Sequence, residues 1–422
     1  MIRILVLSIV TLIAVLTWNV AVFFAFSEGW LKSPIVDSAS PAAFVEATEK
    51  QVAEEHVGNF SMILIEGGAN EGSYFISNGE PVDGSSVYQV ASLGKWITAW
   101  GVMALVEDGA IDLDTPISEY LTRWRLPDSE FDNSAVTVRR LLSHTSGLSD
   151  GLGYDGFDRA EDLQSLEESL TRALDASPGK SGVVELGAEP GSAWDYSGGG
   201  YTVLQLLVEE VSGQSFADFM SERVFAPLGM ERTTFSHEEA MRLGLAQNFN
   251  LNGKIEPFRW YTALAATSLF TSADDLATFI SVQTTSGGQS VLSDDALELM
   301  RTPHASQMSA DIWGLGPMLY APNNVGGHVI GHDGNNGPAI NTVARLDPAT
   351  GDGIVILSTG SEILATKLAG EWVFWKTGNV DSLTFLMSAK TMLVWMGLGT
   401  AAVLLVGLAL GFSSIRKRGA HI

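Results

Sequence analysis

The sequence contains no cysteine among its 422 residues, and this absence excludes three kinds of chemistry. Without thiols the chain can form no disulfide, no thiolate zinc site and no cysteine nucleophile. Basic residues are also scarce, because 24 lysines and arginines face 49 aspartates and glutamates, for a net charge of −25. Nucleic acids are bound by basic surfaces, so we expect no nucleic-acid partner. The acidic balance is typical of a solvated protein surface.

Two long apolar segments lie near the ends of the chain. Residues 4–26 contain no charge and follow Arg3, and residues 391–412 contain no charge and precede the basic run 416–418. Each segment is long enough to cross a bilayer as a helix, and Gly407 and Gly411 would let another helix approach the second one closely. Basic residues flank the outer end of each segment, so both chain ends are expected in the cytoplasm. The section between them would then be exported, at the cell membrane and exposed to the periplasm or the exterior.

These segments divide the chain into parts. Residues 1–27 are expected to be a signal anchor or a cleaved signal peptide, and their length favours the anchor. The remaining parts are a linker (28–42), a soluble domain (43–385), a transmembrane helix (391–412) and a basic cytoplasmic tail (413–422).

Strand-like segments lie at both ends of the soluble domain. Residues 60–65 and 73–76 predict a hairpin, and residues 341–346 and 353–357 predict a second strand pair. Helical patterns fill the middle, including 203–211 and 216–224, and a closing helix is expected around Trp372. We therefore expect an α/β (α+β) fold, in which an antiparallel sheet built from both ends is flanked by helices and carries an inserted, mainly helical subdomain.

The segment Ser92-Leu93-Gly94-Lys95 stands between a strand-like run (86–90) and an apolar helix (96–106). A serine and a lysine three apart at a helix start lie on the same face. The amine can then take the hydroxyl proton, and the free N–H groups of the helix start point at the reaction. The same spacing recurs at Ser177 and Ser414, but in a Pro-Gly loop and in the basic tail. An ordinary N-cap serine is the structural alternative at Ser92.

Three further segments follow in order: residues 105–117, a helix end with an acidic turn; residues 141–148, with His144-Thr145-Ser146-Gly147; and residues 190–198, with Tyr196-Ser197-Gly198. Together with Ser92 and Lys95, they resemble the serine β-lactamase and penicillin-binding-protein-like hydrolases. The nearest branch is that of class C β-lactamases, D-aminopeptidases and esterases. The resemblance runs from about residue 43 to residue 375 and implies a serine hydrolase domain over 43–385.

The resemblance implies that Ser92 is the acylated nucleophile, that Lys95 is its helical partner and that Tyr196 places its phenol near the serine oxygen. Amine and phenol both titrate at about 10 in water, so each needs a shifted pKa to act near neutrality. Either Lys95 or Tyr196 can be the base. An oxyanion hole would use the backbone N–H groups of Ser92 and Asn335, with Gly334 allowing close approach. No metal or organic cofactor is implied, and the substrate would be a small molecule or a peptide.

Two departures from the family pattern bear on the substrate. The tyrosine motif usually ends in asparagine, whereas this chain has Gly198 and lacks an amide that would contact Lys95. The late Lys-Thr-Gly-type motif is matched by His332-Asp333-Gly334. A neutral imidazole holds a substrate carboxylate poorly, and the charge of His332 is expected to vary near a pH of about 6.5. His332 therefore favours an uncharged ester or amide over penicillins and D-alanyl-D-alanine.

The sequence thus predicts a membrane-anchored, exported serine hydrolase that acts through a Ser92 acyl-enzyme on an ester or amide. A non-catalytic binding or regulatory protein on the same scaffold stays open, as does a true β-lactamase or D-Ala-D-Ala carboxypeptidase. A metal pair at His328 and His332 is disfavoured, because the surrounding glycines argue against a helix. His144 is expected to be a hydrogen-bonded loop histidine, and residues 261–269 are expected to line the cleft. The oligomeric state is left open.

Overall fold

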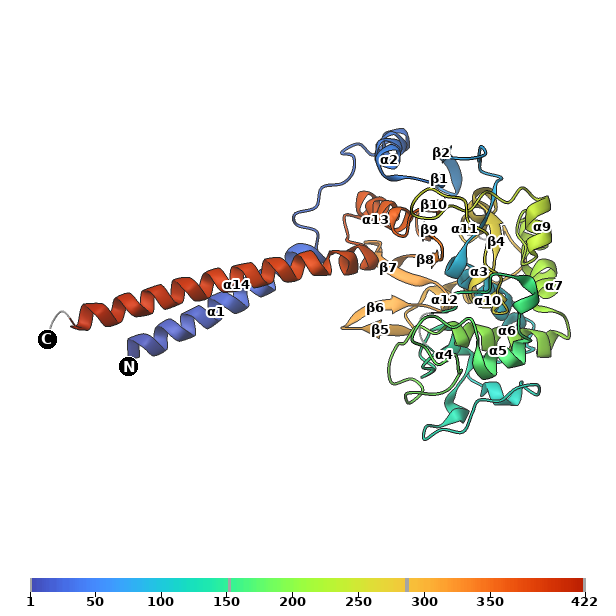
Figure 1. Cartoon of the computed structure of the whole chain (residues 1–422), viewed down its shortest axis with the longest axis horizontal. Coiled ribbons are helices and arrows are strands. Elements are labelled where there is room, and N and C mark those ends of the chain that lie inside the picture. The colour runs from blue at the N-terminus through green and yellow to red at the C-terminus, as the bar shows by residue number, and fades with distance from the viewer. Residues whose placement is uncertain (1, 151–152, 285–287, 420–422) are drawn as a thin grey trace.

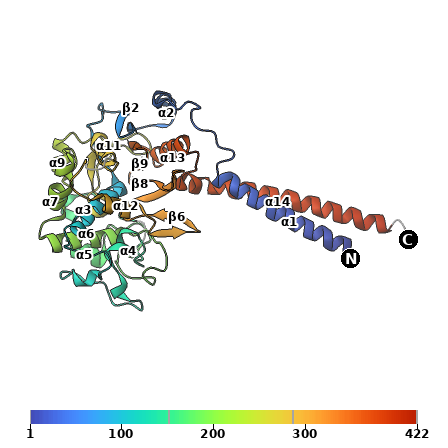
Figure 2. The ribbon, with the colours of Figure 1, turned by 180° about the vertical axis from the view of Figure 1, so that it is seen from behind.

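The computed structural model describes residues 2–150, 153–284 and 288–419. Two long helices, α1 (Ile2–Ser27) and α14 (Ser382–Gly419), lie side by side and project from a rounded domain that contains the other elements (Figure 1). The view from behind shows the same arrangement, with the chain ends at the far tip of the helix pair (Figure 2).

An antiparallel sheet forms the centre of the domain. In the described residues it has eight strands in the order β2-β1-β10-β9-β8-β7-β6-β5. The first hairpin pairs with the last strand, with Phe60 opposite Ser358, so the predicted sheet from both chain ends is confirmed. The strands are β1 (Asn59–Glu66), β2 (Ala69–Ser77), β5 (Ala305–Gln307), β6 (Ala310–Trp313), β7 (Met318–Pro322), β8 (His328–Asn336), β9 (Ile340–Asp347) and β10 (Asp352–Thr359).

Strand β1 shows why the sheet is covered on both faces. Its side chains alternate, so that Met62 and Leu64 join one apolar core while Ile63 and Ile65 join the other. On the first face lie α2 (Pro41–Glu55) and α13 (Leu364–Thr377), which contains Trp372 as predicted. The second face is covered by α3 (Gly94–Glu107) and α11 (Ala273–Ser281).

The helical subdomain is inserted between β2 and β5. The predicted helix at 203–211 is α6, and the helix predicted at 216–224 is α7, which continues into a π-helical turn. Its elements and the small sheet beside it are β3 (Val87–Gln89), η1 (Ala91–Leu93), η2 (Ile117–Glu119), η3 (Asn133–Ala135), α4 (Val138–Leu142), η4 (Ala160–Asp162), α5 (Leu166–Arg172), α6 (Gly198–Ser212), α7 (Phe216–Met220), η5 (Ser221–Phe225), α8 (Ala226–Leu228), α9 (His237–Arg242), α10 (Leu264–Thr267), β4 (Phe270–Ser272) and α12 (Asp294–Arg301).

The C-terminal helix is longer than the sequence predicted. It begins at Ser382 rather than at 391, because the Asp381 carboxylate accepts hydrogen bonds from the N–H groups of Leu383 and Thr384. It continues to Gly419, so the tail predicted at 413–422 begins inside the helix, and residues 420–422 lie outside the described residues. The predicted linker 28–42 also ends early, since α2 starts at Pro41.

Two segments of these helices are long and apolar enough to cross a membrane. They are Leu5–Ser27, with a mean hydropathy of 2.3, and Ser382–Phe412, with a mean hydropathy of 2.2. This finding rests on length and composition, and an N-terminal signal sequence passes the same test.

Polar and small residues join α1 to α14. The Asn19 amide donates to the Thr400 hydroxyl at 2.9 Å, and the Trp18 indole donates to the Trp395 carbonyl at 3.1 Å. A Cβ atom placed on Gly407 would lie 2.6 Å from the Thr11 hydroxyl oxygen. The helix that approaches Gly407 closely is thus the chain's own first helix.

Candidate active site

Ser92 lies in a tight turn between β3 and α3. The preceding residue, Ala91, has a φ of +50°, a left-handed conformation that alanine rarely adopts. This turn, η1, runs directly into α3, so that Lys95 falls in the first turn of the helix, on the side of Ser92. The local geometry expected from the Ser-x-x-Lys spacing is therefore present.

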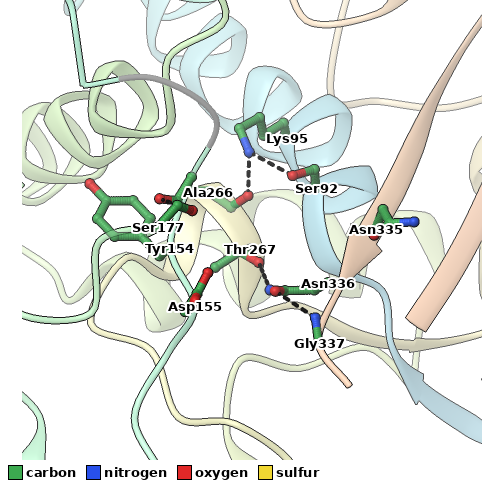
Figure 3. A pocket seen from close by; sticks show the side chains of 11 residues that line it. Ser92, Lys95, Tyr154, Asp155, Ser177, Ala266, Thr267, Asn335, Asn336 and Gly337 are labelled. Carbon is green, nitrogen blue, oxygen red and sulfur yellow. Dashed lines mark hydrogen bonds between the residues drawn. The ribbon is translucent and has the colours of Figure 1, made fainter. Parts of the chain in front are cut away.

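Lys95 is buried and contacts Ser92 directly. Its Nζ atom is 3.0 Å from Ser92 Oγ and donates to the Ala266 carbonyl at 2.5 Å (Figure 3). Burial lowers the pKa of Lys95 to about 7, and the charge of Asp150 opposes this shift. A substantial share of the amine is therefore neutral near pH 7 and able to accept a proton.

Tyr196 lies beside the same serine and the same lysine. Its phenol shares a hydrogen bond with Ser92, and the Lys95 amine lies 5.0 Å from the centre of its ring. Burial raises the pKa of Tyr196 above its ordinary value, although the hydrogen bond to Ser92 partly offsets this. The phenol therefore keeps its proton at neutral pH.

His144 supports Tyr196 from behind. The ring centres of the two residues are 4.4 Å apart, and His144 Nδ1 accepts a hydrogen bond from the Ser197 N–H at 3.1 Å. His144 is 1% exposed and does not line the cavity beside Ser92. The structure thus confirms a hydrogen-bonded loop histidine at this position.

His332 is buried beside Tyr196, with the two ring centres 6.4 Å apart. Its side chain is buried, its Nδ1 atom is 2.6 Å from the Asp333 carbonyl oxygen, and its ring packs 5.4 Å from that of Trp313. Burial, followed by the charge of Lys95, lowers the pKa of His332 to about 3. The expected change of charge near pH 6.5 is therefore wrong, because the imidazole is sealed from water beside a lysine. Neither His332 nor Tyr196 is among the residues that line the cavity beside Ser92.

Strand β8 brings Gly334 and Asn335 against the turn that carries Ser92. A Cβ atom on Gly334 would collide with the Val90 carbonyl oxygen and would lie 3.1 Å from the Leu93 nitrogen. Only glycine therefore permits this approach. Asn335 lines the same cavity as Ser92, and its side-chain amide is turned to the Glu362 carbonyl at 2.6 Å.

The cavity beside Ser92 has a volume of about 230 Å³. Ala266 and Thr267 belong to the segment that was expected to line the cleft. The sequence analysis did not predict the other wall residues. Two of them lie near a sequence signal, because Asn336 directly follows Asn335 and Ser177 has a lysine three residues further on. The lining residues are Ser92, Lys95, Gly153, Tyr154, Asp155, Ser177, Ala266, Thr267, Asn335, Asn336 and Gly337.

The space beside Gly198 is filled by an aromatic ring. A Cβ atom on Gly198 would lie 3.2 Å from Tyr154 Cε2 and 3.1 Å from Gly153 Cα. The Tyr154 hydroxyl is held by Thr202 at 2.8 Å. The amide that the family pattern would place at residue 198 is thus replaced here by a glycine and a neighbouring tyrosine.

No group of metal-binding side chains accompanies this cavity in residues 2–150, 153–284 and 288–419. His328 and His332 both lie in β8, where residues four apart are separated by about 13 Å. That separation is too large for two ligands of one ion.

A serine that contacts a buried lysine and a tyrosine, between an antiparallel sheet and a helical subdomain, defines a class of serine hydrolase. The Beta-lactamase family model matches residues 44–369, and the chain belongs to this family. It is a serine hydrolase of the β-lactamase family.

Relatives and a solved structure show which members the chain is similar to. Penicillin-binding protein 4 of Amycolatopsis lactamdurans is 30% identical over 329 residues, which cover 73% of this chain and 82% of that protein. Esterase EstB of Burkholderia gladioli is 31% identical over 240 residues, which cover 53% of this chain and 58% of the esterase. The octameric penicillin-binding protein homologue from Pyrococcus abyssi has a TM-score of 0.68 at 25% identity, over 80% of this chain and 78% of that one.

Proposed function

We propose that Ser92 is the acylated nucleophile of a membrane-anchored hydrolase that cleaves an uncharged ester or amide on the outer side of the membrane. The observation that carries this proposal is the 3.0 Å contact between Ser92 Oγ and a buried Lys95 whose pKa is lowered to about 7. This pair supplies both a nucleophile and a group that can take its proton.

The reaction has two steps. Ser92 Oγ forms a bond to the substrate carbonyl carbon while its proton passes to the Lys95 amine, and the C–O or C–N bond breaks as the leaving group takes this proton from Lys95. Water then attacks the acyl-enzyme, the acid is released and Ser92 regains its proton. The pKa of Tyr196 is raised, so the phenol serves as a hydrogen-bonding group and Lys95 as the base. Backbone N–H groups of Ser92 and Asn335 would hold the oxyanion, at about 3 kcal/mol each.

The charges of the cavity support an uncharged substrate. Among its described lining residues the one cationic side chain is Lys95, which already contacts Ser92 and the Ala266 carbonyl. Asp155 adds a carboxylate to the wall, and His332 is neutral. A carboxylate on the substrate, as in penicillins and D-alanyl-D-alanine, would find no free cation here and would face Asp155.

The two terminal helices support the membrane part of the proposal. Both have the length and hydropathy of spans, and both chain ends lie at the tip remote from the catalytic domain (Figure 1). The bonds from Trp18 and Asn19 to α14 support retention of α1 as an anchor rather than its removal. The domain would then lie in the periplasm or outside the cell, with both ends in the cytoplasm.

The test uses the full chain in mild detergent with a fluorophosphonate probe, a p-nitrophenyl ester and a chromogenic cephalosporin. We expect labelling and ester hydrolysis by the wild type and none by Ser92→Ala. Ser177→Ala is the matched control, since Ser177 also has a lysine three residues on and lines the same cavity without touching Lys95. It should still be labelled. A folded wild type without adduct would instead favour a binding or regulatory protein, and cephalosporin turnover would overturn the substrate assignment.

A further inference from the structure

The Asp150 carboxylate bonds to the first turn of α6, the helix that follows Tyr196. One carboxylate oxygen accepts a hydrogen bond from the Ser197 hydroxyl, and the other accepts one from the Gly199 N–H at 2.5 Å. The Ser197 hydroxyl oxygen in turn accepts from the Gly200 N–H at 2.8 Å. Free N–H groups at a helix start favour a negative charge, so Asp150 and Ser197 together satisfy this helix end.

The glycines of this turn make room for the carboxylate. A Cβ atom on Gly199 would lie 2.9 Å from both Cγ and Oδ2 of Asp150, which is closer than such atoms pack. The run Gly198-Gly199-Gly200 is thus the beginning of a helix, and an acidic side chain accepts a hydrogen bond from its first turn. Tyr154, four residues after Asp150 in the sequence, packs its ring on Gly198.

This clamp fixes the backbone on both sides of Tyr196. On one side the Ser197 N–H is bonded to His144 Nδ1, and the Ser197 hydroxyl is bonded to Asp150. On the other side the Asp195 N–H donates to the His144 carbonyl at 2.8 Å. The Tyr196 phenol that contacts Ser92 is therefore held at its position through Asp150 and His144.

Asp150 is bonded to the residue that follows Tyr196, and the Lys95 amine lies 5.0 Å from the centre of the Tyr196 ring, so the carboxylate is close enough for its charge to act on the amine. The charge of Asp150 raises the pKa of Lys95 against the larger effect of burial. The other titratable groups around the amine are His144 and His332, whose pKa values are lowered, and Tyr196 and Tyr201, whose pKa values are raised. All four are neutral near pH 7, which leaves Asp150 as the charge that acts on Lys95. Burial raises the pKa of the Asp150 carboxyl, and the hydrogen bonds from Ser197 and Gly199 offset this rise by favouring the charged form.

We propose that Asp150 is a positioning residue of this active site, which holds Tyr196 through the first turn of α6 and supplies the negative charge that faces Lys95. The proposal rests on the function proposed above. The Asp150 carboxylate thus has two separable effects. It fixes the position of the Tyr196 phenol, and it raises the proton affinity of the Lys95 amine.

Two substitutions separate these effects. In Asp150→Asn the amide oxygen can accept from Gly199 and the amide nitrogen can donate to Ser197, so the clamp is kept while the charge is lost. In Asp150→Ala both are lost. Asp195→Asn is the matched control, because Asp195 is an exposed carboxylate in the same segment and makes no side-chain bond in the described residues.

The measurements are the pH profile of p-nitrophenyl ester hydrolysis and the deuterium uptake of the segment 196–203 in the full chain. Loss of the charge should lower the pKa of Lys95, so both Asp150 variants should move the acid limb of kcat/KM down by about one pH unit. Asp150→Ala should in addition lower the plateau of kcat by about 100-fold. It should also speed deuterium uptake in 196–203, whereas Asp195→Asn should match the wild type in all three readouts.

Each part can fail by itself. An acid limb at the wild-type pH in Asp150→Asn would overturn the electrostatic effect, and unchanged uptake in Asp150→Ala would overturn the positioning effect. A wild type that hydrolyses no ester and takes no probe would overturn the proposed function instead. The uptake comparison would still decide whether Asp150 holds the Tyr196 segment.

Discussion

At the residue scale, burial decides which groups of the site change charge near neutral pH. Removal from water disfavours the charged form of every group, so it lowers the pKa of Lys95 and His332 and raises that of Tyr196. The outcomes differ because the starting values differ. Burial lowers the pKa of Lys95 to about 7, so this amine changes charge near neutral pH. It lowers the pKa of His332 to about 3, so this imidazole stays neutral.

The first prediction concerns the pH dependence of the reaction. Below about pH 7 Lys95 is an ammonium group and cannot accept the Ser92 proton, so kcat/KM should rise as the pH increases through about 7. In His332→Gln the rate should fall, but the midpoint should stay where it is, because His332 carries no charge in this range. Rates from pH 5 to 9 for both proteins test this. A midpoint that disappears or moves in the variant would make His332 the titrating group.

The second prediction concerns the missing amide. Gly198→Asn restores the family's usual residue, but its Cβ atom would lie 3.1 Å from Gly153 Cα and 3.2 Å from the Tyr154 ring, so these neighbours would have to shift. We expect a loss of about 1–3 kcal/mol in the free energy of unfolding, as for other overpacked sites, and lower activity rather than higher.

Two further variants test this explanation by urea unfolding. Gly213→Asn is the control, because Gly213 ends α6 with open space around it. It should change stability little, since asparagine tolerates the left-handed conformation. Gly198→Asn combined with Tyr154→Ala should recover part of the loss. A stable, more active single variant would contradict the role given to Tyr154.

At the scale of elements, the paired helices α1 and α14 present small residues where they meet. Trp18 packs on Gly399 and Thr11 packs on Gly407, and polar bonds from Trp18 and Asn19 cross between the helices. Polar bonds and close backbone approach are the forces that hold helices together in lipid, where apolar surface gives no advantage. Contacts of this kind would hold the pair together in a membrane.

This pairing predicts a specific cross-link. A Cβ atom on Gly407 would lie 3.4 Å from Thr11 Cβ, close to the separation in disulfides. The native chain has no cysteine, so Thr11→Cys with Gly407→Cys should oxidise to a single intramolecular bond. Thr11→Cys with Gly397→Cys is the control, because nothing lies near Gly397. After cleavage of the segment 28–40, α1 should remain attached until reduction. Loss of residues 1–27 from the mature chain would refute a retained anchor.

The same elements show how far the sequence predicts this molecule. Four strands of the sheet, β1, β2, β9 and β10, and helix α6 follow from periodicity, which is local, and the Ser92–Lys95 contact follows from helix geometry. The sequence pattern did not predict the other four strands, β5 to β8. Asp150 and Tyr154 could not be assigned in this way, because they lie in a loop whose place depends on contacts with α6. The protonation state of His332 depends on how deeply its side chain is buried, and burial cannot be deduced from a short sequence motif. The start of α14 depends on the Asp381 cap, which lies outside the apolar run from which the transmembrane segment 391–412 was predicted.

At the scale of the whole molecule, one buried ion network connects the sheet to the C-terminal helix. Arg345 in β9 is fully buried, with Nη1 2.5 Å from Asp333 Oδ1 and Nε 3.3 Å from Asp381 Oδ2. Its guanidinium lies 3.4 Å from the centre of the Tyr320 ring. Asp333 follows His332 in β8, and Asp381 caps α14. The helix that would enter the membrane thus starts from the same network as the strand beside the active site.

The last prediction tests this connection. Asp381→Asn keeps a good helix cap but removes one of the two carboxylates that offset the buried Arg345 charge. Breaking a buried pair in this way should cost about 3 kcal/mol in the free energy of unfolding. Asp128→Asn is the control, since Asp128 is exposed, and urea unfolding of the full chain in detergent measures both. An unchanged value for Asp381→Asn would mean that Asp333 alone balances Arg345. The start of α14 would then be joined to the domain by the cap and by packing alone.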